Sequence, residues 1–261
     1  MLSTRIFVSL VGIPILILLL YLGGIVFSVA IGIIAFLSMV EFYNFFSDRN
    51  IILNKELGLT LGAIFPMIAY FFGAIGLIGA VSFSLLIILL WKIISDKAEI
   101  SGAAITYIGV IYVSLSLSHL VLIEKFVDGA LFVFFTFLAT WIADTSAYGV
   151  GRLIGSRPLA KKISPNKTIE GFVGAIVINV IIFSFLIWMP LLTFYERVIF
   201  AASISVLATL GDLVESSIKR GAGVKDSGTL IPGHGGFLDR FDSMIFTGVG
   251  SFYLILLFIK I

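Results

Sequence analysis

The sequence predicts an all-α, polytopic integral membrane protein with about nine transmembrane helices. Of its 261 residues, 60% are apolar and 12% are charged, whereas a soluble domain carries about 45–50% and about 25%. The mean hydropathy is +1.18. The apolar residues form continuous runs near the length of roughly 20 residues that crosses a bilayer as a helix. They lack the alternation that membrane barrel strands require.

Nine apolar runs are the candidate membrane spans. They cover approximately residues 6–22, 24–47, 57–76, 78–95, 101–121, 129–152, 170–189, 196–216 and 242–260. Gly23-Gly24 separates the first two runs and Gly76–Gly79 the next two, so each pair is expected to form a tight helical hairpin. The first run resembles a signal peptide, but apolar residues continue to Phe46, which favours a retained span.

The distribution of basic residues predicts the topology. Alternate loops, beginning with the N-terminus, hold 14 of the 17 Lys and Arg residues. The positive-inside rule therefore places the N-terminus in the cytoplasm and the C-terminus outside. The two loops richest in basic residues, 152–169 and 217–241, share the cytoplasmic face. We expect one membrane domain over 1–261, with supporting helices over about 6–121 and site-bearing helices and loops over about 129–260.

Residues 211–242 combine carboxylates, basic side chains and seven glycines. Asp212, Glu215, Ser216 and Lys219 are spaced to share one face of a helix end. A carboxylate within an apolar span costs about 2.5–3.5 kcal/mol by insertion scales, so an ion-pair partner or a functional role is the default interpretation of Asp212. For carboxylates that begin the ninth helix, such as Asp242, stabilisation by the helix dipole is the alternative.

The residue types in this segment indicate its ligands. The chain has no Cys and the segment has one His, so its carboxylates suit Mg²⁺ better than zinc. Four neighbouring basic residues suit phosphate groups, and glycine amides are able to cradle phosphate oxygens. The segment therefore predicts a metal–nucleotide or metal–pyrophosphate site at the membrane surface.

Two further segments carry polar residues near the same face. Residues 164–171 read SPNKTIEG, and Ser164 followed by a proline predicts the N-cap of the seventh helix. Asp144 lies inside the sixth apolar run and is expected to face the bundle interior or a water-filled cavity. Glu41 in the second run is within reach of the cytoplasmic interface, and His119 fits a packing role, so neither is assigned to the site.

Residues 216–242 resemble the signature of the phosphatidate cytidylyltransferases, also called CDP-diacylglycerol synthases. All signature positions are filled, as Ser216-x-Ile218-Lys219-Arg220, Lys225-Asp226, Gly228, Pro232-Gly233-His234-Gly235-Gly236 and Asp239-Arg240-x-Asp242. The family also carries segments similar to those around Lys167 and Asp144. The resemblance implies that CTP and phosphatidate react to give CDP-diacylglycerol and pyrophosphate, the activation step of phospholipid biosynthesis.

The resemblance also implies roles for individual residues. The expected metal ligands are Asp212, Asp239, Asp144 and Asp242. The expected catalytic residues are Lys219, Arg220, Lys225, Asp226, His234 and Arg240. The expected substrate-binding residues are Lys167, Ser216, Gly235 and Gly236. Lys167 and Glu170 are both interpreted as functional, whereas Arg157, Lys161 and Lys162 are expected only to hold their loop at the membrane surface.

The implied cofactor is Mg²⁺, as one of two metal ions of which the second could be monovalent. Implied partners are CTP, phosphatidate, membrane lipids and a second copy in a homodimer, with no nucleic acid. The expected location is a bacterial cytoplasmic (inner) membrane, with the site facing the cytoplasm. A CTP-using polyprenol or phytol kinase is the nearest alternative, and a transporter is the alternative from another class. The paired motif of CDP-alcohol phosphotransferases is missing from the sequence.

Overall fold

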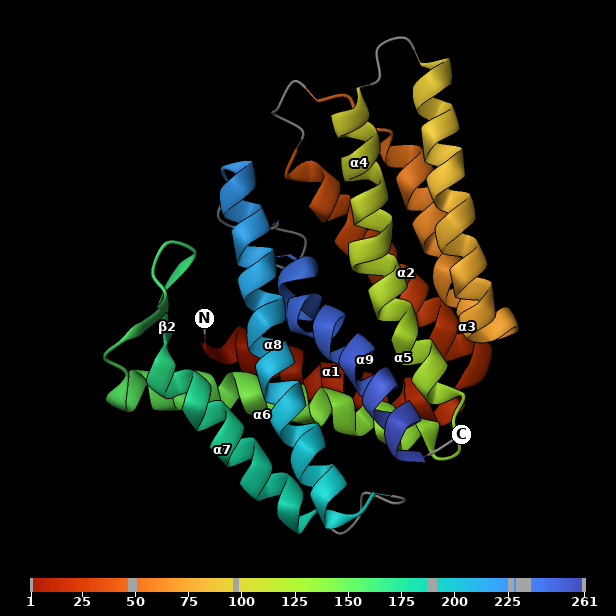
Figure 1. Ribbon diagram of the computed structural model, residues 1–261. Helices are drawn as coiled ribbons and strands as arrows, with labels where there is room; N and C mark the ends of the chain where they lie inside the picture. The colour runs from red at the N-terminus through yellow and green to blue at the C-terminus, as the bar shows by residue number, and fades with distance from the viewer. Residues whose placement is uncertain are drawn as a thin grey trace.

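The computed structural model describes residues 2–46, 51–95, 99–186, 192–224, 228 and 236–259, with side chains from residue 12 onward. Helices dominate these residues, and a small β-hairpin projects from the bundle (Figure 1). The elements are α1 (Leu2–Leu22), α2 (Gly24–Asn44), α3 (Lys55–Ile94), α4 (Ile100–Gly109), η1 (Val110–Leu115), α5 (Ser116–Glu124), α6 (Gly129–Ile154), β1 (Pro158–Ala160), β2 (Ser164–Thr168), α7 (Ile169–Phe185), α8 (Phe194–Ala222) and α9 (Leu238–Ile259).

The helices have the character of a membrane bundle. Within the described residues, six helical segments are long and apolar enough to cross a bilayer, and Gly12–Leu22 and Ile169–Phe185 are shorter apolar helices. Large apolar side chains project outward, including Ile75 at 84% exposure and Ile94 at 81%. Such surfaces are stable against lipid rather than water. The predicted all-α membrane fold is confirmed.

Glycine turns lie near both of the predicted hairpin positions, but α1 and α2 diverge from their turn and do not pack as a tight hairpin (Figure 1). Gly23 and Gly24 have φ values of 57° and 52°, and they separate α1 from α2 as predicted. The second break lies at Gly73, with φ 64° and ψ −155°, rather than at Gly76–Gly79. A left-handed backbone of this kind carries no steric cost for glycine. Figure 1 shows α3 doubling back on itself, so its 40 residues form two helical limbs.

The predicted fifth run is not a uniform α-helix. It consists of α4, the π-helical turn η1 and α5. Gly109 ends α4 directly against the ring of Tyr43, whose hydroxyl donates a 2.7 Å hydrogen bond to the carbonyl of Thr106. This close packing of α2 on α4 and η1 involves a residue far away in sequence. Helical periodicity alone therefore could not predict the π-turn.

Helices α6 to α9 pack around buried polar side chains. In Figure 1, α6 lies across α8 and α9, and it contacts both as well as α7. Asn179 of α7 is fully buried and donates to the carbonyl of Ala139 at 3.0 Å and to Ser205 Oγ at 2.8 Å. The Thr140 hydroxyl of α6 donates to Thr247 of α9 at 3.0 Å. Such hydrogen bonds stabilise helix–helix contacts in lipid, where burial of apolar surface contributes little to helix association.

The connection from α6 to α7 corrects one prediction. Ser164 does not cap a helix, because Ser164–Thr168 forms β2, antiparallel to β1. Helix α7 begins at Ile169, and the Thr168 side chain accepts from Gly171 N at 3.1 Å as its N-cap. Pairing with β1 extends the chain through Pro165, so the cap moves four residues onward. The hairpin stands beside the ends of α6 and α7 (Figure 1).

Candidate active site

Four helices and the hairpin enclose a polar cavity of about 430 Å³. It lies between the C-terminal parts of α6 and α8 and the N-terminal parts of α7 and α9. Its lining residues are Asp144, Ala147, Tyr148, Gly151, Arg152, Leu159, Asn166, Lys167, Thr168, Gly171, Phe172, Thr209, Asp212, Asp239, Asp242 and Ser243. Segments more than 60 positions apart in the sequence thus bring four aspartates and a lysine to one space.

Lys167 and Asp212 join the two polar segments identified in the sequence. The Lys167 ammonium lies 2.5 Å from Asp212 Oδ2, and both side chains are partly exposed to the cavity. Asp212 Oδ1 accepts a 3.3 Å hydrogen bond from the hydroxyl of Ser216, one helical turn later. The predicted shared face of Asp212 and Ser216 is therefore present, and β2 supplies the opposing charge.

Asp144 and Asp242 add two further carboxylates from α6 and α9. Asp144 is accessible from the cavity, whereas Asp242 is only 9% exposed. The charges of Asp144, Asp212 and Asp242 lie close enough to repel one another. A cation relieves such repulsion, so the cavity favours positively charged ligands beside these three side chains.

A buried ion-pair network lies next to the cavity. The Lys219 ammonium is 2.6 Å from Asp239 Oδ1 and 2.5 Å from Glu215 Oε2, and the Glu215 side chain is almost fully buried. Asp239 Oδ2 accepts from Gly236 N at 3.0 Å. Lys219 therefore ties α8 to the first turn of α9, which agrees with the sequence prediction that both helix ends form one site.

The donor set fits a hard divalent ion in its chemistry. Four aspartates supply the oxygen ligands that Mg²⁺ prefers, and none of the lining residues offers sulfur. Within the described residues, no three acidic or histidine side chains lie close enough to enclose an ion. Lys167 and Lys219 instead neutralise Asp212 and Asp239.

The structure places some of the remaining predicted residues and leaves others undescribed. The side chains of Arg220 and Arg240 are exposed and do not line the cavity. Gly236 belongs to the site through its amide. Lys225, Asp226, His234 and Gly235 lie outside the described residues.

Two features of the site were not predicted. The Glu41 carboxylate of α2 accepts from Phe237 N at 2.9 Å and from Leu238 N at 2.8 Å, at the start of α9. In the sequence, Glu41 is marked only by being a lone carboxylate inside an apolar run. The buried hydroxyl of Tyr112 in η1 has no hydrogen-bond partner among the described residues. No sequence pattern marked that tyrosine.

Glu170 has a different role from the one the sequence suggested. Its carboxylate accepts from Ser156 N at 3.1 Å, Ser156 Oγ at 3.0 Å and Arg157 N at 3.2 Å, and pairs with Arg157 Nε at 2.8 Å. These contacts fasten the start of the hairpin to the first turn of α7. Glu170 does not line the cavity, so it acts on the fold of the segment that carries Lys167.

A sequence profile of the cytidylyltransferase family matches residues 3–258, nearly the whole chain. This protein belongs to the cytidylyltransferase family. A phosphatidate cytidylyltransferase of Bacillus subtilis is 32% identical over 263 aligned residues, covering 97% of each chain. One from Staphylococcus saprophyticus is 31% identical, covering 94% of this chain and 95% of its own. One from Staphylococcus haemolyticus is 39% identical over 61% of this chain and 62% of its own. Membership of the family makes the polar cavity its candidate active site.

Proposed function

We propose that this protein is a phosphatidate cytidylyltransferase that joins the cytidylyl group of CTP to phosphatidate. The observation that carries the proposal is the meeting of Lys167 with Asp144, Asp212, Asp239 and Asp242 in one cavity of a cytidylyltransferase-family membrane protein. The full-length relatives named for this activity support it. A cavity at helix ends in a membrane bundle suits a water-soluble nucleotide and a lipid headgroup that must meet.

In the proposed reaction, a phosphate oxygen of phosphatidate attacks the α-phosphorus of CTP. The bond between that phosphorus and the bridging oxygen to the β-phosphorus breaks, and pyrophosphate leaves with the electron pair. Phosphatidate is already ionised at neutral pH, so no strong general base is needed. Positioning and charge neutralisation are then the main tasks of the protein.

Different basic residues neutralise different phosphate groups of the two substrates. Lys167 binds the phosphatidate headgroup or the triphosphate. Four other basic residues neutralise the triphosphate and the leaving pyrophosphate; they are Lys219, Arg220, Lys225 and Arg240. Asp226 belongs to the same catalytic segment. Ser216, Gly235 and Gly236 contribute to substrate binding, and His234 orients a phosphate or shapes its turn.

Asp212 and Asp239 are the proposed principal ligands of Mg²⁺, with Asp144 and Asp242 beside them. The chemistry that bound metal supplies is neutralisation of the reacting phosphates, and a second ion, which could be monovalent, is part of the proposal. Lys167 and Lys219 pair with these two principal carboxylates, so the same lysines would be available to bind phosphate when the carboxylates hold a metal ion. The lysines and aspartates therefore form one exchangeable set of charges.

The proposed topology has nine crossings, a cytoplasmic N-terminus and an external C-terminus. The break at Gly73 supports counting α3 as two crossings. The apolar helices α1 and α7 supply two more. The cavity then opens toward the cytoplasm, between the two most basic loops. A bacterial cytoplasmic membrane and a homodimer complete the proposal.

The deciding experiment measures whether label from the cytosine ring of CTP enters the lipid product. Purified protein is incubated with phosphatidate, Mg²⁺ and CTP labelled in the cytosine ring, beside samples with EDTA and with Asp239→Asn. We expect label in the lipid extract that depends on phosphatidate and is lost in both controls, with Asp239→Asn still folded. Wild-type activity in Asp239→Asn would refute its role as a ligand.

Two outcomes identify the alternatives. A lipid kinase transfers the γ-phosphate and leaves the cytidine behind, so γ-labelled CTP with a polyprenol acceptor labels the lipid while cytosine-labelled CTP does not. Silence in both assays, from protein shown to be folded, would favour a transporter instead.

A further inference from the structure

Glu41 is a buried carboxylate of α2, and none of the described residues of α1 to α5 lines the cavity. It lies near the C-terminal end of α2 and is only 2% exposed. Within the described residues no lysine or arginine pairs with it, and Phe237 and Leu238 donate their backbone N–H groups to its two oxygens. An uncompensated carboxylate is costly in such a position, so these two hydrogen bonds determine where the side chain is stable.

The two amides belong to the start of α9. The first N–H groups of a helix have no partner within the helix, and its N-terminus carries partial positive charge. A carboxylate that accepts from two consecutive amides pairs these N–H groups and places a negative charge next to the positive end of the helix. The Asp239 side chain holds the preceding amide, that of Gly236, at 3.0 Å. Three successive N–H groups are thus fixed by two carboxylates, one from α2 and one from α9.

This arrangement sets the position of two proposed metal ligands. Asp239 lies one residue beyond the amides held by Glu41, and Asp242 lies one helical turn later. Any rotation or shift of the first turn of α9 moves both carboxylates relative to Asp144 and Asp212 on other helices. A misplacement on the order of 1 Å is enough to lose about a hundredfold in rate.

Gly228 lies against the same carboxylate. A Cβ atom at Gly228 would lie 2.9 Å from Glu41 Oε1, closer than such contacts normally come. The absence of a side chain lets the backbone at Gly228 approach Glu41. Gly228 is a signature position, and its contact with α2 gives a physical reason for glycine there.

We propose that Glu41 is a positioning residue of the active site, which fixes the first turn of α9 and so aligns Asp239 and Asp242 with the carboxylates of α6 and α8. The role in catalysis rests on the proposed cytidylyl transfer. The contact itself is a property of the fold and is testable without activity.

Glu41→Gln is the sharpest variant, because glutamine keeps the volume but presents one acceptor and one donor. Its amide group faces a backbone N–H, so one hydrogen bond is lost and the negative charge at the helix N-terminus disappears. The matched control is Glu124→Gln. Glu124 also accepts a backbone N–H at the start of a helix, that of Gly24 at 2.9 Å, but between α5 and α2 and away from the cavity.

We expect Glu41→Gln to lower kcat at saturating CTP and phosphatidate by at least about tenfold per folded molecule, as expected for loss of a charge-assisted hydrogen bond. Glu124→Gln should keep kcat within about twofold. Hydrogen exchange of the peptide spanning 236–244 should accelerate in Glu41→Gln alone. Gly228→Ala, which crowds the same carboxylate, should also lower kcat. This variant tests the same contact if Glu41→Gln does not fold.

The outcomes separate the two proposals. Unchanged kcat and unchanged exchange at 236–244 in Glu41→Gln, or equal loss of kcat in Glu124→Gln, overturns the positioning role. If the wild-type protein transfers no cytidylyl group, the proposed function fails, while the exchange measurement still tests whether Glu41 holds α9.

Discussion

Two pairs of carboxylates, one pair in each half of the molecule, are stabilised in different ways. In α1 to α5, Glu41 and Glu124 accept hydrogen bonds from backbone amides at the beginnings of other helices. In α6 to α9, Asp212 and Asp239 pair with lysine ammonium groups beside a cavity. We expect a carboxylate satisfied by amides to stay in place, and a carboxylate paired with a lysine to exchange partners when a phosphate or a cation binds.

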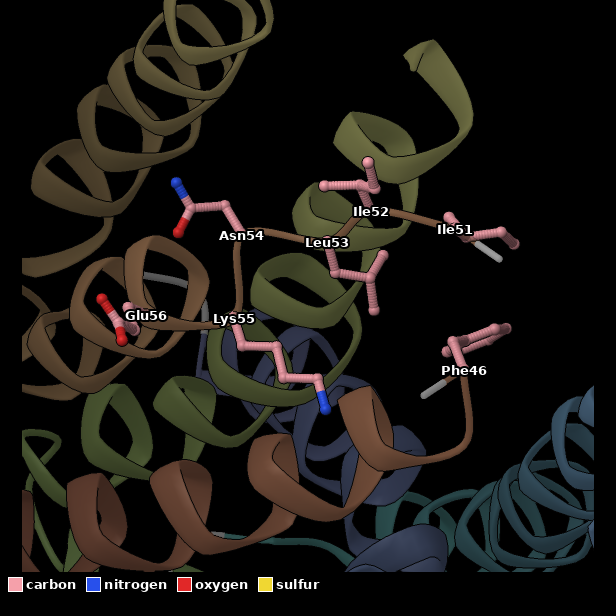
Figure 2. Close-up of a pocket in the computed structure, with 7 residues that line it drawn as sticks. All are labelled: Phe46, Ile51, Ile52, Leu53, Asn54, Lys55 and Glu56. Carbon is pink, nitrogen blue, oxygen red and sulfur yellow. The ribbon is translucent and has the colours of Figure 1, made fainter. Parts of the chain in front are cut away.

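Two cavities of similar volume differ in how their walls are built. Figure 2 shows the cavity of about 450 Å³ at the start of α3, lined by Phe46 and the continuous stretch Ile51–Glu56. One stretch of chain supplies nearly all of its wall, and most of its side chains are apolar. The polar cavity draws its walls from α6, β2, α7, α8 and α9 and carries four aspartates. Convergence of charges from distant segments, rather than volume, distinguishes the candidate active site.

Of the substitutions considered, Asp212→Asn should cause the largest loss of activity. Loss of a carboxylate that faces Lys167 and a proposed metal site should lower kcat/KM by more than about 100-fold, with the melting temperature nearly unchanged. Asp128→Asn is the control, because Asp128 is an exposed residue with φ 56°, a conformation that asparagine also tolerates. Initial rates with both substrates varied measure the effect. Equal activity in the two variants would remove Asp212 from the site.

Lys167→Gln should have an intermediate effect. Without the ammonium group, Asp212 loses its ion pair and a phosphate loses its counter-charge, so kcat/KM should fall roughly 10- to 100-fold. Lys161→Gln, an exposed change in the same hairpin, should stay within about twofold. KM for CTP and for phosphatidate, measured separately, identifies which phosphate Lys167 binds. Matching losses in the two lysine variants would point to a general charge effect of the hairpin.

Glu124→Gln should have the smallest effect on activity and act on stability instead. It weakens the hydrogen bond to Gly24 N, which is worth about 1 kcal/mol, so the melting temperature should fall by roughly 2–4 °C. Thermal unfolding in detergent measures this change. A large loss of kcat without a change in melting temperature would contradict the separation between the two halves.

Much of the architecture was predictable because apolar run length is a local property. The turn at Gly23-Gly24 is confirmed. The ends of α8 and α9 meet through the ion pair of Lys219 with Asp239. The break in α3 was placed at Gly76–Gly79, but it lies at Gly73. Several nearby glycines permit a turn, and packing of the two limbs selects one of them. Ser164 and Pro165 formed a good local helix start that pairing with β1 overrode.

The candidate site was predictable in its residue types but not in its pairings. The carboxylates and lysines stood out because charge is rare in an apolar chain. Which lysine meets which aspartate depends on helix packing, as Lys167 with Asp212 shows. Glu41 was passed over because its partners are backbone amides about 200 positions away, and no side-chain pattern records them.

By itself, the sequence determined that this protein is a helical membrane protein with a charged, glycine-rich segment at one face. The length of the apolar runs, the distribution of basic residues among the loops and the residue types are all properties of the sequence that do not depend on which segments pack together. Only the tertiary structure decided that Asp144, Lys167, Asp212 and Asp242 share a cavity. Only packing decided that α2 holds the start of α9. The reason is physical: hydrophobicity acts residue by residue, whereas a buried charge is stabilised only by the particular groups that the fold brings to it.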